Sequence, residues 1–325
     1  MLRQFIDRLQ ARDSVDEIYR VADKQMRANR QGNDYLLLQL ADRSGQICGM
    51  RWNANQSLYE SFQKGDFLRI IGTTQLHNGL LQIIVQDFES VPRDKVDLAD
   101  FAINNPQEIE NLFADLKKLL ASVRNEHLRR LADAYLNDER LVDRLRRAPA
   151  GVKTHHAYEG GLLKHIVDLM RLAQNVAPSY PQLDSEMLLT GVFLHDLGKL
   201  DELSYDGDLT YTDPGQMLGH LVQGVVELER RARQVLQSTG QEIPSEILWR
   251  LEHMIVSHHG YLEHGSPKVP MTIEALVLHY LDDMDAKVNT ATELIRSDRN
   301  SDSVWTAFHP TLGRKLYKPS DSQKN

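Results

Sequence analysis

The sequence predicts a multidomain protein in which a small all-β barrel is followed by an all-α helical bundle. Segments that alternate apolar and polar residues, separated by turn residues, fill positions 15–90. From position 106 onward, apolar residues instead recur at helical spacing. A chain of 325 residues is long enough for two domains of ordinary size.

Five strands are expected in the N-terminal region, with one short helix between the third and the fourth. The helix is expected at 57–63, and Asn78-Gly79 marks a tight hairpin turn between the last two strands. The strands are predicted at 15–26, 35–40, 46–52, 66–72 and 80–85. This number and order resemble the OB-fold, a small barrel that often binds single-stranded nucleic acid through strands two and three.

Aromatic and basic side chains lie on or beside the predicted strands of this barrel. The rings of Tyr35, Trp52 and Phe67 are candidates for stacking on bases. The candidates for phosphate contacts are Arg27, Arg30, Arg43, Arg51 and Lys64. The alternative interpretation places the rings in the barrel core and the arginines in solvent. We retain Tyr35, Arg51 and Trp52 as candidate substrate-binding residues.

A linker and a helical collar are expected after the barrel. The pattern loosens over 91–105, and residues 106–147 then carry apolar side chains at helical spacing. Pro149 and Gly151 close this helical segment. The predicted boundaries are therefore 1–92 for the barrel, 93–150 for the linker and collar, 151–313 for the second domain and 314–325 for a polar tail.

The composition is that of a globular protein with an acidic surplus. Because the net charge is -8, any surface that binds nucleic acid has to be local. No apolar run approaches the roughly 18 residues that a membrane span needs. The single cysteine, Cys48, excludes an intrachain disulfide and fits a reducing compartment. We expect a cytoplasmic protein with no membrane partner, and the sequence leaves a homo-oligomer open.

The pair His195-Asp196 stands near the end of an apolar run, 187–197, that predicts a buried helix. Gly198 is expected just past the helix end, in the left-handed conformation that glycine tolerates. An imidazole and a carboxylate at such a place are half of a site for a divalent metal ion. Taken alone, the pair is explained more simply as a hydrogen-bonded pair in the core.

Most of the 13 histidines lie between positions 151 and 290. His165 and His220 fall in apolar helical contexts, and His258-His259 precede a glycine at a helix end. Asp282 and Asp285 are three residues apart and share a helical face. Buried polar groups need partners, and a shared pair of metal ions would satisfy all of these groups at once.

The order His, His-Asp, His, His-His, Asp resembles the HD-domain superfamily of metal-dependent phosphohydrolases. That resemblance implies an all-helical bundle with the site at its centre. An OB-fold followed by an HD domain is similar to the YhaM-type 3′-5′ exoribonucleases, and the resemblance spans nearly the whole chain. The local sequences that carry it are 154–163, 195–199, 257–260, 265–268 and 282–287. Glu159 stands where that family often has proline.

The resemblance implies a ligand set for two divalent ions. The first ion would be held by His165, His195, Asp196 and Asp282. The second would be held by His220, His258 and His259, with Asp196 bridging both. Asp285 would orient a ligand histidine from behind. A set of imidazoles and carboxylates without thiolate suits Mn²⁺, Fe²⁺, Co²⁺ or Mg²⁺, and the resemblance favours manganese.

The candidates for contacts with substrate lie beside these ligands. Lys199 follows the His-Asp pair and would contact the phosphate, so that Lys199 and Asp196 are the candidate catalytic residues; the alternative for Lys199 is a solvated lysine. His155 and His156 would either contact the substrate phosphate or cap the first helix of the domain. Lys268 is a further candidate for binding substrate, as is Lys287.

The activity implied by the resemblance is hydrolysis of single-stranded RNA from its 3′ end to 5′-mononucleotides. Two metal ions would lower the pKa of a bridging water, and the barrel would hold the strand. One alternative is hydrolysis of a nucleotide or a cyclic dinucleotide, and another is 3′ exonuclease action on single-stranded DNA. A non-catalytic binding protein with structural metals is a third. The preference for RNA rests on the resemblance alone.

Overall fold

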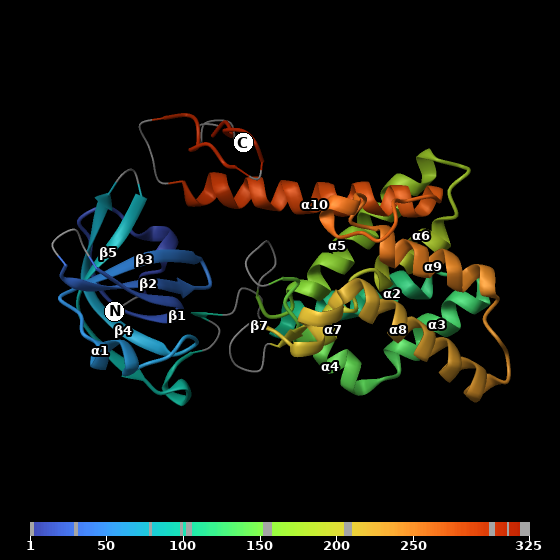
Figure 1. The fold of residues 1–325 in the computed structure, drawn as a ribbon, viewed down its shortest axis with the longest axis horizontal. Helices are drawn as coiled ribbons and strands as arrows, with labels where there is room; N and C mark the ends of the chain where they lie inside the picture. Colours follow the sequence, from blue (N-terminus) through green and yellow to red (C-terminus); the bar gives the residue numbers. More distant parts are fainter. Residues whose placement is uncertain are drawn as a thin grey trace. The chain divides into compact units, whose positions relative to one another are not determined.

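The computed structural model of the chain forms two compact units (Figure 1). One unit comprises Met1–Asn105 and Ala291–Asn325, and the other comprises Pro106–Thr290. These limits differ from the predicted boundaries at 92, 150 and 313. The residues that the structure describes are 3–28, 32–77, 80–97, 100–101, 106–151, 158–204, 210–298, 303–310 and 312–318.

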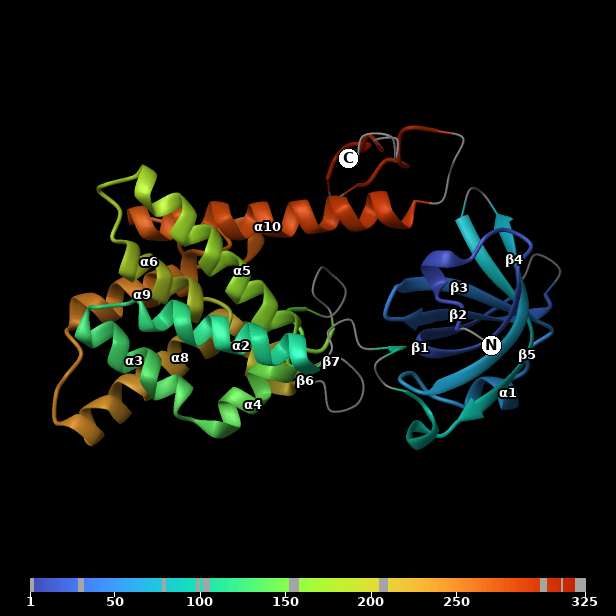
Figure 2. The same ribbon diagram turned by 180° about the vertical axis from the view of Figure 1, so that it is seen from behind.

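The first unit contains a closed five-stranded barrel in the order β1-β2-β3-β5-β4, which confirms the predicted OB-fold. Neighbouring strands pair antiparallel, except that β3 and β5 run parallel. Figure 2 gives the view of the barrel from behind. Its elements are η1 (Ile6–Arg8), β1 (Ser14–Ala28), β2 (Asp34–Asp42), β3 (Gly45–Trp52), α1 (Gln56–Glu60), β4 (Phe67–His77), β5 (Leu80–Val91) and η2 (Arg93–Lys95).

The barrel follows the predicted alternation, with two differences. Leu36, Leu38 and Leu40 alternate along β2 and are buried inside the barrel. Helix α1 ends at Glu60 rather than at residue 63, because the chain turns there and buries Phe62 among the core side chains. Phe67 is also buried, packed edge-on against Phe101 at 4.9 Å between ring centroids, so this ring is not open to a base. The predicted Asn78-Gly79 turn lies outside the described residues.

The second unit is helical, as predicted, with one small addition. A two-stranded sheet of β6 (Leu203–Ser204) and β7 (Thr210–Tyr211) interrupts the helices. Helix α10 begins in this unit, and its residues from Ala291 onward belong to the other unit. The helices are α2 (Pro106–Ala121), α3 (Glu126–Leu136), α4 (Glu139–Arg147), α5 (Gly161–Val176), η4 (Ala177–Ser179), α6 (Ser185–Leu194), α7 (Lys199–Glu202), α8 (Asp213–Thr239), α9 (Ser245–Ser257), η5 (Leu262–His264) and α10 (Ile273–Ser297).

The predicted helical collar packs on the helices that follow it and shares their buried core. Helix α2 runs along α5, as Figure 2 shows, and Leu116 is fully buried in the same cluster as Ile166. Tyr135 of α3 packs edge-on against Phe193 of α6, with ring centroids 5.7 Å apart. Burying a side chain of this size stabilises a fold by about 1.5–3 kcal/mol. These contacts hold in place the helices that carry the histidines.

Beyond α10, the described residues 304–309 and 312–318 form a short hairpin. Residues 314–318, predicted as the start of a polar tail, pair with residues 304–309 through the bridges Trp305–Tyr317 and His309–Arg314. Within the described part of the chain, no helix has both the length and the apolar character required to cross a membrane.

A pair of carboxyl groups, Glu229 of α8 and Glu252 of α9, makes a pH dependence testable. Burial and the hydrogen bond with Glu229 raise the pKa of Glu252 to about 7, from 4.5. The folded chain therefore binds this proton more tightly than the unfolded chain, and stability falls as pH rises between these values. At pH 8 we expect the free energy of unfolding of Glu252→Gln to exceed that of the wild type by on the order of 1 kcal/mol. This value is already reduced for the screening of the carboxyl pair by solvent.

Urea unfolding at pH 8 and at pH 4 measures this difference. At pH 4 both chains carry a neutral group at position 252, so the two curves should coincide. Glu242→Gln, at an exposed position in the loop before α9, is the matched control and should change neither curve. Parallel pH profiles for Glu252→Gln and the wild type would show that the carboxyl pair does not share a proton.

Candidate metal centre

The turn after α6 forms the floor of the site. Asp184 caps the start of this helix by accepting a hydrogen bond from the Met187 amide. The helix ends at Leu194, three residues earlier than predicted; His195 is its C-cap, and Asp196 lies in the turn that leads to α7. Both His195 and Asp196 are buried, at 0% and 2% exposure. A charged carboxylate at this depth requires cationic or hydrogen-bonding partners.

Gly198 has a different role from the one predicted. Its backbone is right-handed, with φ -59° and ψ -22°, so the expected left-handed conformation is wrong. A Cβ at this position would lie 2.0 Å from the carbonyl oxygen of His220 and 2.7 Å from the amide nitrogen of Gly224. Glycine is needed because the backbone of α8 passes directly against this turn.

The close approach at Gly198 predicts a stability cost. We expect Gly198→Ala to destabilise the fold by roughly 1–3 kcal/mol, because the methyl group would meet backbone atoms that cannot rotate away. Gly224→Ala is the control, because the nearest atom to its Cβ would be a side-chain methyl of Ile255, at 3.1 Å, and the backbone of Gly198 would be in ordinary contact at 3.8 Å or more. Urea unfolding compares the two variants. An unchanged midpoint for Gly198→Ala would mean that the turn and α8 are not held this close.

Five imidazole rings form a continuous array above this floor. They come from α5, from the turn after α6, from α8 and from the end of α9. Consecutive ring centroids are 5.4 Å apart for His165 and His195, 4.8 Å for His195 and His258, and 4.5 Å for His258 and His259. The ring of His220 lies 5.1 Å from that of His259. The structure thus brings together all the histidines that the sequence assigned to metal binding.

The donor atoms fall into three overlapping groups that could hold a metal ion. Within each group these atoms lie within 4.8 Å of one another. The groups are His165, His195 and Asp282; His195, Asp196 and His258; and His220, His258 and His259. The two outer groups contain the predicted ligands of the two ions other than Asp196, and Asp196 belongs to the middle group.

The Asp196 carboxylate faces both sides of the array. Its Oδ2 lies 3.6 Å from His165 Nε2 and 3.4 Å from His195 Nε2. Its Oδ1 lies 3.5 Å from His220 Nε2 and 3.6 Å from His258 Nε2. Among the described residues, Oδ1 of Asp196 and Nε2 of His220 are buried without a hydrogen-bond partner. Because such groups are costly to leave unsatisfied, a cation between them fits the site.

Every ring in the array is oriented by an acceptor at its outer nitrogen. The Nδ1 atoms of His195, His258 and His259 donate to the carbonyl oxygens of Val192, Ile255 and His264, at 2.7, 2.7 and 3.1 Å. A carbonyl oxygen can only accept, so the proton of each neutral ring is on Nδ1 and the Nε2 lone pair is available. This is the arrangement that metal-binding histidines usually show.

The carboxylates of Asp285 and Glu202 orient the remaining two rings, those of His165 and His220. Asp285 Oδ2 lies 3.0 Å from His165 Nδ1, in the orienting position predicted for it. Glu202 Oε1 accepts from the backbone nitrogen of His220 at 3.0 Å and lies 3.1 Å from its Nδ1. Burial opposes the charge on Glu202, but the hydrogen bond with His220 lowers its pKa below the usual value.

Glu202 is the residue that the sequence reasoning missed. Its backbone partner is freed by a kink in α8, where Gly219 has φ 71° and ψ 162°, just before His220. Only a weak pattern in the sequence points to it: a glutamate three residues after Lys199, and a Gly-His pair at 219–220 further along the chain. Only the folded chain places the two together.

Burial and neighbouring charges shift the pKa values of several groups in the site. Burial opposes ionisation of Asp196, but Lys199 and His195 hold the pKa of this carboxyl well below its usual value. Burial and the neighbouring His258 lower the pKa of His259 to about 4, so this ring is neutral at pH 7. Burial also acts on His165, yet Asp282 and Asp285 raise its pKa to about 9. A proton and a divalent cation therefore compete for Nε2 of His165.

Of the basic residues predicted to bind substrate in the helical unit, Lys199 lies at the candidate metal centre. Lys199 Nζ lies 2.7 Å from Asp196 Oδ2 and its side chain is 19% exposed, so it belongs to the site. Lys268 is exposed and lowers the pKa of His253, after the larger effect of burial. Lys287 pairs with Asp283 at 2.7 Å. His155 and His156 lie outside the described residues.

On the barrel, Tyr35 and Trp52 form one aromatic surface. They are paired across β2 and β3, and their ring centroids are 5.2 Å apart. Trp52 is 42% exposed. Arg51 is in register with the buried Leu36 and therefore points to the opposite face of β3 from Trp52. The two residues, which are adjacent in sequence, cannot make the same contact.

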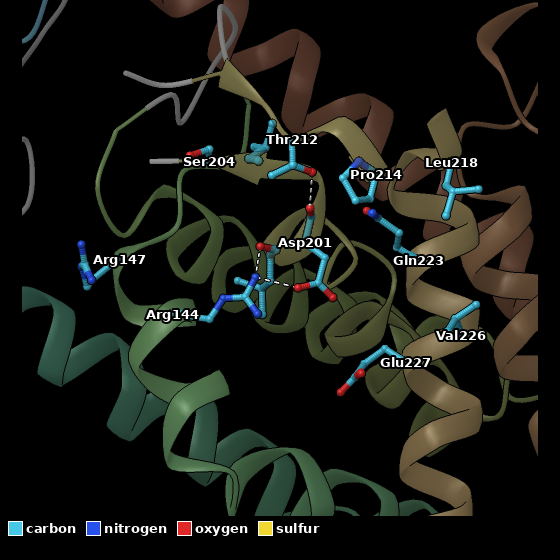
Figure 3. Close-up of a pocket in the computed structure, with 12 residues that line it drawn as sticks. Arg144, Arg147, Asp201, Ser204, Thr212, Pro214, Leu218, Gln223, Val226 and Glu227 are labelled. Carbon is cyan, nitrogen blue, oxygen red and sulfur yellow. Dashed lines mark hydrogen bonds and ion pairs between the residues drawn. The ribbon is translucent and has the colours of Figure 1, made fainter. Parts of the chain in front are cut away.

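A separate pocket of about 660 Å³ lies beside α7 and α8 (Figure 3). Arg144 and Asp201 both line it, with Nη2 of Arg144 at 2.7 Å from Oδ1 of Asp201. The hydroxyl of Thr212 donates a hydrogen bond to the Asp201 carbonyl. None of the histidines of the array lines this pocket. It is distinct from the candidate metal centre.

Known proteins resemble both parts of the chain. The HD domain matches residues 162–287, and an OB-fold nucleic acid binding domain matches residues 19–91. Among solved structures, the second OB-fold domain of replication protein A from Methanococcus maripaludis covers 30% of this chain and 100% of its own, with 22% identity and a TM-score of 0.23.

Two full-length relatives carry the same name. The 3′-5′ exoribonuclease YhaM of Bacillus subtilis is 31% identical over 314 residues, which is 95% of this chain and 96% of that protein. The 3′-5′ exoribonuclease YhaM of Bacillus licheniformis is 32% identical over 294 residues, 89% of each chain. With this identity over nearly the whole length of both proteins, the chain belongs to the family of the 3′-5′ exoribonuclease YhaM.

Proposed function

We propose that this protein is a 3′-5′ exoribonuclease that shortens single-stranded RNA to 5′-mononucleotides. The observation that carries the proposal is the array of five histidines, each oriented through Nδ1, four of which direct Nε2 toward the buried carboxylate of Asp196. The OB-fold barrel supplies a surface for single-stranded nucleic acid, and the names of the relatives support RNA as the polymer. A cytoplasmic location is part of this proposal.

The donor set fits two divalent ions, with manganese favoured. One would be held by His165, His195, Asp196 and Asp282, and the other by His220, His258, His259 and Asp196. When bound, such ions lower the pKa of a water molecule and stabilise the negative charge of a phosphate under attack. Asp285 and Glu202 hold the tautomers of two of the ligand rings.

The chain's own side chains position the substrate around this centre. Lys199 is held at Asp196, where its ammonium group would contact a non-bridging oxygen of the terminal phosphate and stabilise charge there. Tyr35 and Trp52 would stack on bases farther along the strand, and Arg51 would meet a phosphate. His155, His156 and Lys268 remain candidates for further phosphate contacts.

The test is the product pattern from a labelled RNA. With Mn²⁺ present, a single-stranded RNA labelled at its 5′ end should give a ladder of shortened labelled chains, together with unlabelled 5′-mononucleotides. Early release of the label as a mononucleotide would refute the 3′-5′ polarity. Parallel reactions with single-stranded DNA of the same sequence and with a cyclic dinucleotide test the other substrate classes. If either is hydrolysed faster than RNA, RNA is not the preferred substrate.

A further inference from the structure

The hairpin formed by residues 304–309 and 312–318, which we call the C-terminal hairpin, carries a pair of aromatic rings. Its two sides are joined by backbone hydrogen bonds from Thr306 to Leu316 at 2.8 Å and from Lys318 to Val304 at 2.7 Å. Trp305 and Tyr317 are bridge partners, with ring centroids 5.4 Å apart and planes inclined by 69°. Directly opposed residues share a face of a hairpin, so both rings lie on the same side.

These rings remain open to solvent. Trp305 is 49% exposed and Tyr317 is 53% exposed, and Phe308 near the turn is 58% exposed. An edge-on pair of this kind helps to hold the hairpin together, but that role leaves about half of each ring surface uncovered. Exposed aromatic surface at this density usually marks a contact site.

The charged residues of the hairpin itself are all basic. The sequence from Val304 to Lys318 contains no aspartate or glutamate, although the whole chain has a net charge of -8. Arg314 and Lys315 are exposed, and among the described residues no carboxylate forms an ion pair with either. Lys318 is engaged with Asp298 at 3.2 Å. Two exposed cations thus lie on the same short segment as the ring pair.

We propose that the C-terminal hairpin is a second base-stacking surface for single-stranded RNA, additional to the one on the barrel. Trp305 and Tyr317 stack on bases, and Arg314 and Lys315 contact phosphates, the combination that binds single strands without sequence preference. Aromatic residues and arginine are enriched in protein–protein interfaces whereas lysine is depleted, so Lys315 and the absence of carboxylates from Val304 to Lys318 are what favours a polyanion over a second copy of the chain. The proposal rests on the proposed function, which supplies RNA as the substrate.

Fluorescence of Trp305 tests the contact directly. The chain has three tryptophans, so Trp52→Phe/Trp249→Phe leaves Trp305 as the only one. Titration of this variant with a 20-residue oligoadenylate in EDTA should quench its emission saturably, because a stacked base changes the environment of the indole. Unchanged emission at an RNA concentration that saturates the same variant by anisotropy would overturn the proposal.

Affinity measurements on the full-length protein provide the second test. Fluorescence anisotropy of labelled oligoadenylate in EDTA should show a loss of roughly 5-fold or more for Trp305→Ala/Tyr317→Ala, and Trp305→Phe should retain most of the affinity. Neutralising Arg314→Gln/Lys315→Gln should reduce the slope of log affinity against log salt by about 1.4, which corresponds to two phosphates. These cation variants leave the rings intact, so they remain informative if the ring variant unfolds.

Matched controls lie on the helical unit. Trp249→Ala removes a tryptophan that is 67% exposed on α9, and Arg233→Gln removes an exposed arginine on α8; neither should change the affinity. Unchanged RNA affinity in both hairpin variants would overturn the proposal. If, in addition, the sedimentation mass of these variants changed in the absence of RNA, the hairpin would be a contact between copies of the chain instead. In either case the wild type would still shorten RNA from its 3′ end, so the proposed function would stand.

Discussion

Asp196→Asn is expected to abolish RNA shortening while the fold is retained. The substitution keeps the shape of the side chain but removes the charge that faces four histidine Nε2 atoms at 3.4–3.6 Å. Metal ions contribute several kcal/mol of charge stabilisation in phosphate transfer, so we expect a loss of roughly 10³-fold or more in rate. Manganese retained after gel filtration should fall by at least half.

The matched control for this variant is Asp283→Asn. Asp283 is next to the candidate ligand Asp282 on α10, but its side chain is 39% exposed and pairs with Lys287. It should leave both the rate and the manganese content unchanged. Should Asp196→Asn keep the wild-type manganese content, the carboxylate between the two groups of histidines would not be a metal ligand.

Glu202→Ala is expected to weaken manganese binding by roughly 10–100-fold, the usual cost of removing an acceptor behind a ligand histidine. The same change leaves the buried amide of His220 without its partner, which should lower the free energy of unfolding by about 1–3 kcal/mol. Glu202→Gln retains an oxygen that can accept both hydrogen bonds. We therefore expect it to recover most of the stability but only part of the manganese affinity, because it lacks the charge.

Calorimetric titration with Mn²⁺ and urea unfolding separate the two effects of Glu202. Asp201→Ala is the control, because Asp201 is the preceding residue in α7 but has a half-exposed side chain that pairs with Arg144. It should leave manganese affinity unchanged. If Glu202→Ala binds manganese as tightly as the wild type, the orientation of His220 does not depend on this carboxylate.

The barrel and the bundle could both be predicted from the sequence because each rests on a local periodicity. Leu36, Leu38 and Leu40 alternate along a strand whose inner face is buried, and the comparison with an OB-fold domain agrees. The ligand candidates could be identified because histidine and aspartate in apolar helical sequence need partners, and the family resemblance was confirmed by relatives that match nearly the whole chain. That these residues bind metal remains a prediction.

Other features depended on approaches between distant segments. The role of Gly198 follows from the backbone of α8, more than 20 positions away, so its chain neighbours suggested the wrong conformation. Arg51 and Trp52 alternate along one strand, but the register with β2 decides which of them shares the face of the buried Leu36, namely Arg51. Residues 314–318, the second side of the C-terminal hairpin, are predicted as the start of a polar tail because their sequence is polar and their pairing with residues 304–309 is short.

The amino-acid order alone specifies which chemical groups the site contains, namely imidazoles and carboxylates without thiols, and in which kind of local structure each lies. Which nitrogen of a ring faces inward follows from folding for His165 and His220, because their acceptors Asp285 and Glu202 are contributed by other helices. Hydrogen bonds act over about 3 Å, so an acceptor distant in sequence counts only once packing brings it close. Spacing along a chain specifies the helical face of a side chain, whereas its hydrogen-bond partner is specified by packing.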